Sequence, residues 1–331
     1  KKLQSIINND LNNFKNGHSS KGIVRKLDVL DDYISMIKNN INIENDISCI
    51  MDCGNSVGGL VAPQIFKELG IKLEEIYCDI NPDFPNHHPD PTVDENLNDL
   101  VEAIKIGNYD LGVAYDGDAD RVVAIDEKGN IVRPDILMSI FIPFVIREGE
   151  SVIFDVKCSR SLESTIKKYG GTPIMYKTGH SLIKNKMIDL KSKFGGEMSG
   201  HIFFKDRYYG YDDGIYVSLR LIEILSKTTK KISDYVSEIP EYISTPEIRI
   251  DCNNDDIKFE VANNVKKYFS NKFNCNLIDG VRIEFDYGWG LVRASNTQPV
   301  IVCRFEANSI DNLNRIKNIV FDQIKSHGVD I

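Results

Sequence analysis

Three aspartates recur at every second position after the apolar run 111–115, and they are Asp116, Asp118 and Asp120. Carboxylate oxygens are the preferred ligands of hard divalent cations such as Mg²⁺. The glycine between the first two gives the backbone the freedom to bring the three carboxylates together. Without a cation these acids would repel one another with nothing to offset the repulsion. The pattern therefore predicts a metal-binding loop.

The same acidic segment is also compatible with a solvated turn or with an EF-hand calcium loop. A solvated acidic turn would carry the same residues. An EF-hand loop would use the three aspartates together with Glu127, but Arg121 occupies the position where its sharp turn requires glycine. The flanking apolar runs also indicate strands rather than the helices of an EF-hand, so we favour a loop between two strands.

Two further loops carry polar groups that suit a ligand. The loop 195–201 is rich in glycine and holds Glu197, Ser199 and His201, which can hydrogen-bond to hydroxyl groups, although a plain turn is equally consistent. The loop 293–299 combines a guanidinium, hydroxyls and an amide, a set that suits a phosphate, although a polar surface turn is the alternative. Its candidate ligands are Arg293, Ser295, Asn296 and Thr297.

Single residues elsewhere could complete a site. Lys157 follows the apolar run 152–156, at the carboxyl end of an expected strand, where parallel sheets bind ligands. His180 stands at an expected helix start, which favours anions. Each is also consistent with an ordinary structural role. His87 and His88 look like a metal-binding pair, but their proline-rich surroundings favour a structural loop.

The elements that must position these residues alternate between strands and helices. We expect strands at 47–51, 76–78, 111–115 and 122–126, with helices at 27–41, 58–69 and 97–106. The pattern then restarts with strand 152–155, helix 161–169 and strand 174–176, so we predict two copies of one βαβ-type unit with mostly parallel sheets covered on both faces. In the last part of the chain, the pattern predicts strands at 247–250, 280–285 and 300–305 and helices at 257–269 and 309–324.

The predicted fold class is α/β, with two similar mixed α/β sandwich domains and a small C-terminal α+β domain. The expected segments are a helix and linker at 1–20, followed by domains at 21–148, 149–243 and 244–331. Prolines at 240 and 246 bracket a linker before the last domain, about which hinge motion is expected.

Composition excludes several classes of protein. The chain has 331 residues, 42% of them hydrophobic, which is enough to bury a core and argues against disorder. Its net charge of −9, without long basic runs, disfavours nucleic acid and anionic membranes as partners. No apolar run approaches the roughly 18 residues of a membrane span, and no signal peptide is evident. Seven scattered cysteines without a C-x-x-C motif predict reduced thiols in a cytoplasmic protein.

Taken together, the ordered motifs resemble the α-D-phosphohexomutase superfamily, in particular its bacterial phosphomannomutase/phosphoglucomutase branch. Segment 116–121 is similar to that family's metal-binding loop, 196–201 to its sugar-recognition loop and 293–297 to its phosphate-binding loop. The segments 84–89, 156–160 and 177–181 match as well, and the resemblance extends from about residue 22 to the C-terminus.

The resemblance implies an enzyme that interconverts the 6-phospho and 1-phospho forms of mannose or glucose. In this family a phosphoserine donates its phosphoryl group, and a hexose 1,6-bisphosphate forms as intermediate and activator. By motif, Asp116, Asp118 and Asp120 would bind Mg²⁺, and Arg121 would contact the phosphoryl group in transfer. Glu197 and Ser199 would bind sugar hydroxyls. Lys157, His180 and His201 would line the pocket, and Arg293, Ser295, Asn296 and Thr297 would hold the other phosphate.

The chain departs from the family at one important point. The loop that carries the phosphoserine, of the type T-A-S-H-N-P, does not occur in it, and residues 1–16 look like the last helix of the domain that would hold this loop. We therefore expect the parent protein to be a mutase, with a further N-terminal domain as partner of this chain, and the 331 residues alone to be inactive. Met198, where glucosamine-specific relatives usually have glutamine, favours mannose or glucose over a phosphoglucosamine substrate, which is the alternative. A non-catalytic fragment that binds metal and phosphosugar is a further alternative.

Overall fold

The computed structural model describes residue 7 and residues 23–252, 255–295 and 298–329. The helix expected before residue 20 therefore lies almost entirely outside the described residues. The helix expected at 27–41 is α2 (Leu30–Asn40), which has Asp31 and Asp32 in its first turn and Lys38 in its last, as the helix dipole favours. Residues 1–35 and 36–331 form two separate units, and every strand that the structure describes belongs to the second.

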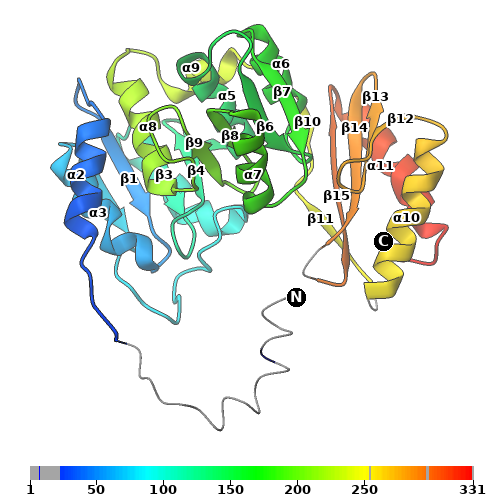
Figure 1. The fold of residues 1–331 in the computed structure, drawn as a ribbon, viewed down its shortest axis with the longest axis horizontal. Coiled ribbons are helices and arrows are strands. Elements are labelled where there is room, and N and C mark those ends of the chain that lie inside the picture. The colour runs from blue at the N-terminus through cyan, green and yellow to red at the C-terminus, as the bar shows by residue number, and fades with distance from the viewer. Residues whose placement is uncertain (1–6, 8–22, 253–254, 296–297, 330–331) are drawn as a thin grey trace. The chain divides into compact units, whose positions relative to one another are not determined.

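The first sheet has five strands in the order β2-β1-β3-β4-β5. Its strands β1, β3 and β4 are labelled in Figure 1. Its strands are β1 (Ser48–Asp52), β2 (Lys72–Ile76), β3 (Leu111–Tyr115), β4 (Val122–Asp126) and β5 (Ile131–Val132). β1 pairs parallel with β2 and β3, whereas β4 and β5 join antiparallel. The short η1 (Val57–Leu60) and α3 (Ala62–Glu68) connect β1 to β2, and η2 (Asp94–Leu97) and α4 (Asn98–Ile106) precede β3.

Both faces of this sheet are covered around its buried strands β1, β3 and β4. Leu100 and Ile104 of α4 pack with Ala114 on one face. On the other face, the hydroxyls of Tyr115 and Ser218 share a hydrogen bond of 2.5 Å. Ser218 belongs to α8 (Gly214–Ser226), a helix buried along its whole length that also packs against the second sheet.

The second sheet repeats the topology of the first, in the order β7-β6-β8-β9. Its elements are β6 (Ser151–Asp155), α6 (Arg160–Lys168), β7 (Thr172–Tyr176), α7 (His180–Leu190), β8 (Phe194–Gly196) and β9 (Ile202–Phe204). β6 is parallel to β7 and β8, and β9 is antiparallel to β8. The predicted duplication of one unit is therefore confirmed. The helices α5 (Pro134–Val145) and α9 (Ile232–Ser237) pack against each other.

One predicted strand was misplaced. The apolar segment 76–78 was expected to pair, but β2 ends at Ile76, and Tyr77 adopts a left-handed conformation with φ of 53°. The pairing strand is the charged segment 72–76, which forms the edge of the sheet. An edge strand does not need apolar side chains on both faces, so its pattern is weak in the sequence.

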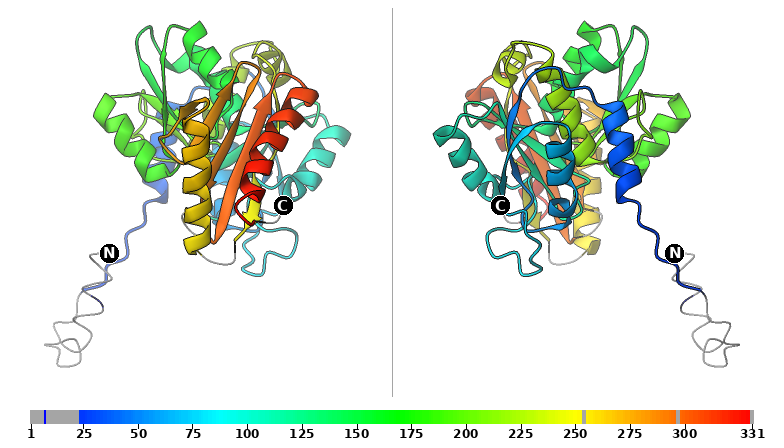
Figure 2. Two further views of the ribbon diagram at one scale, coloured as in Figure 1. Left: turned by 90° about the vertical axis from the view of Figure 1, so that its right-hand side faces the viewer. Right: turned by 90° about the vertical axis from the view of Figure 1, so that its left-hand side faces the viewer.

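The third sheet has six strands, and five of them follow the order β10-β15-β14-β13-β12, while β11 also pairs with β15. The elements are β10 (Ile243–Ser244), β11 (Ile248–Asp251), α10 (Asp255–Ser270), β12 (Asn274–Asn276), β13 (Val281–Phe285), β14 (Gly288–Ala294), β15 (Val300–Ala307) and α11 (Ile310–Lys325). The helices α10 and α11 lie side by side over one face (Figure 2). β14 was not predicted, because Gly288 and Gly290 interrupt its apolar pattern; a Cβ at these glycines would lie within 3.0 Å of Ile316 in α11.

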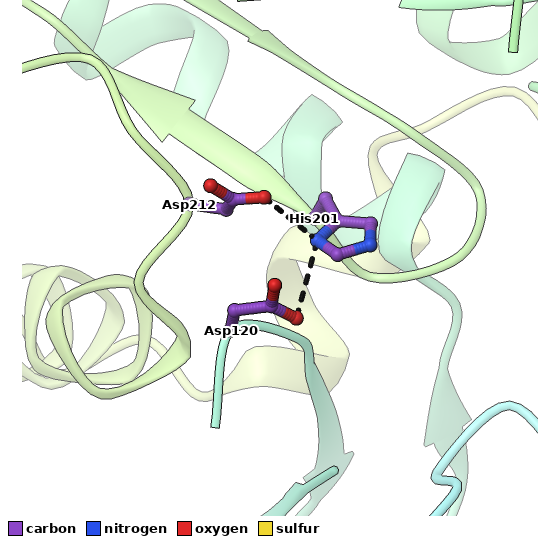
Figure 3. A group of neighbouring side chains, drawn as sticks. All are labelled: Asp120, His201 and Asp212. Carbon is purple, nitrogen blue, oxygen red and sulfur yellow. Dashed lines mark ion pairs between the residues drawn. The ribbon is translucent and has the colours of Figure 1, made fainter. Parts of the chain in front are cut away.

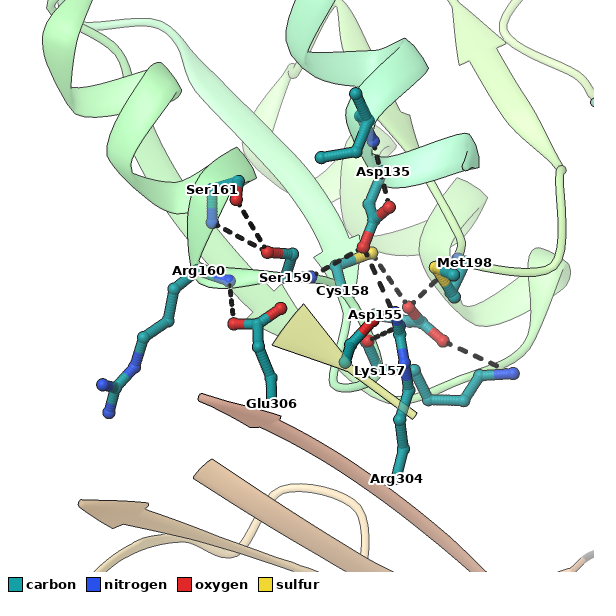
Figure 4. Close-up of polar contacts among 12 residues, drawn as sticks. Asp135, Asp155, Lys157, Cys158, Ser159, Arg160, Ser161, Met198, Arg304 and Glu306 are labelled. Atoms are coloured by element: carbon teal, nitrogen blue, oxygen red, sulfur yellow. Dashed lines mark hydrogen bonds and ion pairs between the residues drawn. The ribbon is translucent and has the colours of Figure 1, made fainter. Parts of the chain in front are cut away.

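The opposite face of the third sheet carries buried charged residues that contact the loop 156–160. The Arg282 guanidinium donates hydrogen bonds of 2.8 Å to the carbonyls of Val156 and Cys158. The Glu306 carboxylate accepts from the Trp289 indole at 2.7 Å. It also accepts from the Arg160 backbone N–H at 3.0 Å (Figure 4). These hydrogen bonds pair buried polar groups of the third sheet with the backbone that follows β6, so they stabilise the contact between the two.

Among the helices that the structure describes, none combines the length and the apolar composition that a membrane crossing requires. All seven cysteines are described, and all are free thiols.

Candidate functional site

The loop between β3 and β4 brings the three predicted aspartates together. One carboxylate oxygen from each of Asp116, Asp118 and Asp120 lies within 4.8 Å of the others. Ala119 has a positive φ of 59°, which turns the backbone so that the alternate side chains converge. Carboxylates of this density fit a hard cation with oxygen ligands. The loop joins two antiparallel strands, so the EF-hand alternative is wrong.

Arg121 partly neutralises this acidic loop. Its backbone N–H donates to Asp116 Oδ1 at 3.0 Å, and its Nε donates to Asp116 Oδ2 at 2.7 Å. A second carboxylate, that of Asp90, accepts from Arg121 Nη1 at 3.1 Å. The sequence did not single out Asp90, which reaches the site from the proline-rich loop. The guanidinium is therefore held in a fixed place beside the aspartates.

The glycine-rich loop occupies the equivalent position in the second sheet, between β8 and β9. Glu197 is buried, and its Oε1 accepts the Gly179 backbone N–H at 2.5 Å. Burial raises the pKa of Glu197 to about 7, and the nearby Asp155 carboxylate adds to the effect. Ser199 is half-buried two residues further on. The carboxyl of Glu197 can therefore exist in either protonation state near neutral pH.

His201, at the end of the same loop, joins it to the aspartate loop. Its Nδ1 lies 3.3 Å from Asp120 Oδ1 and 3.1 Å from Asp212 Oδ2 (Figure 3). Burial alone would lower the pKa of His201, but these two carboxylates raise it. Burial raises the pKa of Asp120 to about 6; His201 opposes this rise, and the Asp116 and Asp118 carboxylates favour it.

Asp212 organises a second group around His201. His180, the first residue of α7, stacks on the His201 ring with the centroids 5.3 Å apart, and its Nδ1 lies 3.1 Å from Asp212 Oδ2. Lys184 donates to Asp212 Oδ1 at 2.7 Å. Hydrogen bonds from His201 and Lys184 hold the pKa of Asp212 well below its usual range despite its burial. His180 and His201, predicted separately, thus share one carboxylate.

Lys157 lies at the carboxyl end of β6, as predicted, and is nearly buried. Its Nζ donates to Glu247 Oε2 at 3.2 Å and lies 4.0 Å from Asp155 Oδ2. Asp155, fully buried, accepts hydrogen bonds from the Met198 backbone N–H at 3.2 Å and from the Thr178 hydroxyl at 3.1 Å. Asp155 therefore ties three of the predicted loops together.

The predicted phosphate loop is described in part. Asn296 and Thr297 lie outside the described residues. Arg293, at the end of β14, is buried, and its Nε lies 3.1 Å from Asp279 Oδ2. The same oxygen accepts the Thr178 backbone N–H at 3.1 Å. Ser295 is buried and accepts the Gln298 backbone N–H at 3.3 Å. A contact path thus connects this loop with the segment 177–181.

The sequence missed the acids that link these loops. Asp155, Asp212 and Asp279 stand in no recognisable motif, and the one usable signal was that Asp155 ends an apolar strand. For His87 and His88 the sequence favoured a structural loop. In the structure, His87 Nε2 lies 3.0 Å from Oδ2 of the buried Asp52. Neither histidine of that pair joins a cluster able to hold a metal among the described residues.

Comparison with known proteins adds an independent finding. Three family models match the chain in order: the alpha/beta/alpha domain II of phosphoglucomutase/phosphomannomutase at residues 31–129, domain III at 133–242 and the C-terminal domain at 247–323. The chain belongs to the phosphoglucomutase/phosphomannomutase family. This confirms the resemblance seen in the motifs. The domain boundaries drawn from the sequence stay predictions.

Individual relatives agree. The chain is 45% identical over 311 residues to a phosphomannomutase/phosphoglucomutase of Pseudomonas aeruginosa, covering 93% of this chain and 67% of that protein. It is 42% identical to a phosphoglucomutase of Neisseria gonorrhoeae, covering 90% and 65%. A crystal structure of a family protein from Burkholderia thailandensis superposes with a TM-score of 0.90 at 36% identity, covering 99% of this chain and 71% of that one. The chain spans about two thirds of the length of these curated relatives.

Proposed function

We propose that the protein to which this chain belongs is a phosphohexomutase, which interconverts the 6-phosphate and 1-phosphate of mannose or glucose through a bisphosphorylated sugar. One observation carries the proposal: the predicted loops touch in an unbroken series. The aspartate loop meets His201 through Asp120, Glu197 meets the segment 177–181 at Gly179, and Asp279 links that segment to Arg293. A ligand with a phosphate at one end and a reacting group at the other would need such an arrangement.

The proposed roles follow from the chemistry of each group. Arg293 and Ser295, with Asn296 and Thr297, would hold the phosphate that is not transferred, because a guanidinium and hydroxyls bind phosphate oxygens well. Glu197 and Ser199 would accept from and donate to sugar hydroxyls. Lys157, His180 and His201 would line the pocket, and the Lys157 ammonium would supply positive charge. Such a pocket gives an acidic chain local attraction for an anionic substrate.

Asp116, Asp118 and Asp120 would hold Mg²⁺. When bound, this ion would neutralise negative charge at the phosphoryl group in transfer. Arg121, fixed by Asp116 and Asp90, would face the same group and add a second positive charge. His201 stands between Asp120 and Asp212, so its imidazole could take or release a proton at the sugar hydroxyl beside the aspartate loop.

Binding is the first test of this proposal. Calorimetric titration of the chain with mannose 6-phosphate and glucose 6-phosphate, with Mg²⁺ present, should detect binding that mannose and glucose lacking phosphate do not show. Arg293→Gln should weaken that binding at least tenfold. The matched control Arg315→Gln alters an exposed arginine on α11, on the helix-covered side of the same sheet, and should leave affinity unchanged. Equal losses in both variants would contradict the assigned phosphate site, and tighter binding of glucosamine 6-phosphate would favour the phosphoglucosamine alternative.

Turnover is the second test. The family's phosphoserine loop does not occur in these 331 residues. We therefore propose that the chain alone binds hexose phosphates without converting them. Measurable formation of mannose 6-phosphate from mannose 1-phosphate by the purified chain would refute this, whereas conversion by the intact protein from its native source would support the mutase assignment.

A further inference from the structure

Two cysteines approach each other behind the aspartate loop. Cys53 follows β1 directly, and Cys78 comes two residues after β2, the parallel neighbour of β1. Their Sγ atoms lie 3.4 Å apart. The other five cysteines, all of which the structure describes, show no sulfur–sulfur contact.

The backbone around this pair holds the two thiols in place. The left-handed conformation of Tyr77 turns the chain after β2, and the Tyr77 hydroxyl donates to Asp99 Oδ2 at 2.7 Å. The Asn55 backbone N–H donates to the Tyr77 carbonyl at 2.7 Å, which ties the two turns together. Gly59 lies so close to the Cys78 carbonyl that a Cβ there would meet it at 1.9 Å. A disulfide has a sulfur–sulfur distance of about 2.0 Å, so the two sulfurs would have to approach each other by about 1.4 Å.

The two thiols differ in access to solvent. Cys78 is half-buried, whereas Cys53 is fully buried. Oxidants therefore reach Cys78 first, and Cys53 stands behind it as the second thiol. The turn that begins at Cys53 also contacts the aspartate loop, because the Ser56 hydroxyl lies within hydrogen-bond distance of the carbonyls of Cys53, at 2.5 Å, and Asp116, at 3.1 Å.

We propose that Cys53 and Cys78 form a redox modification site, which a hydroperoxide converts to a reversible disulfide. The Cys78 thiolate attacks the terminal peroxide oxygen, which breaks the O–O bond and yields a sulfenic acid and water or an alcohol. The Cys53 sulfur then attacks the sulfenic sulfur and displaces water. Two thiols lose two electrons and two protons, and the peroxide is reduced by the same two electrons. A dithiol reductant restores both thiols.

The experiment uses the purified chain and hydrogen peroxide. After oxidation, the protein is denatured, its thiols are alkylated and its tryptic peptides are analysed by mass spectrometry. We expect the peptides 39–67 and 73–105 to be linked, with a mass about 2 Da below their sum and fragment ions that place the link at Cys53 and not at Cys49. The number of alkylated cysteines should fall from seven to five. Dithiothreitol should restore all seven.

Two variants distinguish a disulfide between Cys53 and Cys78 from general cysteine oxidation. Cys78→Ser should abolish the linked peptides, whereas Cys275→Ser, which removes another partly exposed thiol, should retain them. Circular dichroism checks that both variants fold, and the wild-type peptide map decides the question even if Cys78→Ser does not fold. Oxidation of wild-type Cys78 to sulfinic acid without linkage, or linkage of Cys78 to another cysteine, would overturn the proposal.

Discussion

Replacing Glu197 with glutamine should stabilise the chain at alkaline pH. Glu197 is 1% exposed, and the pKa of its carboxyl rises from the ordinary 4.5 to about 7 because burial penalises the charged form. In the unfolded chain the same group loses its proton near pH 4.5. Between these pH values the folded state binds more protons than the unfolded state, so stability falls as pH rises.

The size of the expected change in stability follows from the pKa shift of Glu197. A pKa raised from 4.5 to about 7 costs the folded state about 3 kcal/mol at pH 8, but under 1 kcal/mol at pH 5, where the folded carboxyl is still protonated. Glutamine carries no charge at either pH, and its side-chain oxygen can still accept the Gly179 N–H. The stability gain of Glu197→Gln over the wild type should therefore grow by roughly 2 to 3 kcal/mol between pH 5 and pH 8.

Urea unfolding at both pH values measures this difference, followed by circular dichroism and by the fluorescence of Trp289, the single tryptophan. The control Glu163→Gln changes a partly exposed acid that pairs with Lys167 on α6, and it should change stability by less than about 1 kcal/mol at either pH. A Glu197→Gln gain that does not depend on pH would refute the argument that burial of the charge is the cause.

Three further outcomes are expected. In the intact enzyme, Asp118→Asn should cut turnover strongly while hexose phosphate affinity is largely kept; equal loss of both would mean that the aspartate loop is only structural. Asp212→Asn should lower the pKa of His201, measured by NMR titration of its ring protons, because a carboxylate that raises it is gone; an unchanged pKa would count against this pairing. Arg282→Ala should destabilise the fold by about 3 kcal/mol or more, measured by urea unfolding, because it leaves two buried carbonyls unpaired. The exposed Arg249→Ala should cost less than about 1 kcal/mol, and similar costs for the two arginines would contradict that reasoning.

Local patterns predicted the repeated unit and the convergence of the three aspartates, because both depend on short-range spacing. The β14 strand was missed, because its glycines are explained only by the close approach of Ile316 from a distant helix. Asp155 and Asp212 were missed for a related reason: each acts by joining segments that are far apart in the sequence. A single acidic residue whose partners lie elsewhere in the sequence produces no periodic pattern, so the sequence alone does not reveal its role.

The duplicated sheets have a consequence for how this site can change. The aspartate loop follows β3 and the glutamate loop follows β8, and these strands hold the same place in the two copies. Under the proposed function, the same hairpin position would serve phosphoryl transfer in one copy and sugar recognition in the other. Each hairpin rests on its own sheet, but His201 lies 3.3 Å from Asp120 and the Val122 backbone N–H donates to the Gly200 carbonyl, so a change in residues 197–201 also reaches the aspartate loop. Exchanging residues 197–199 among relatives, with His201 kept in place, would therefore test whether this loop sets the sugar preference.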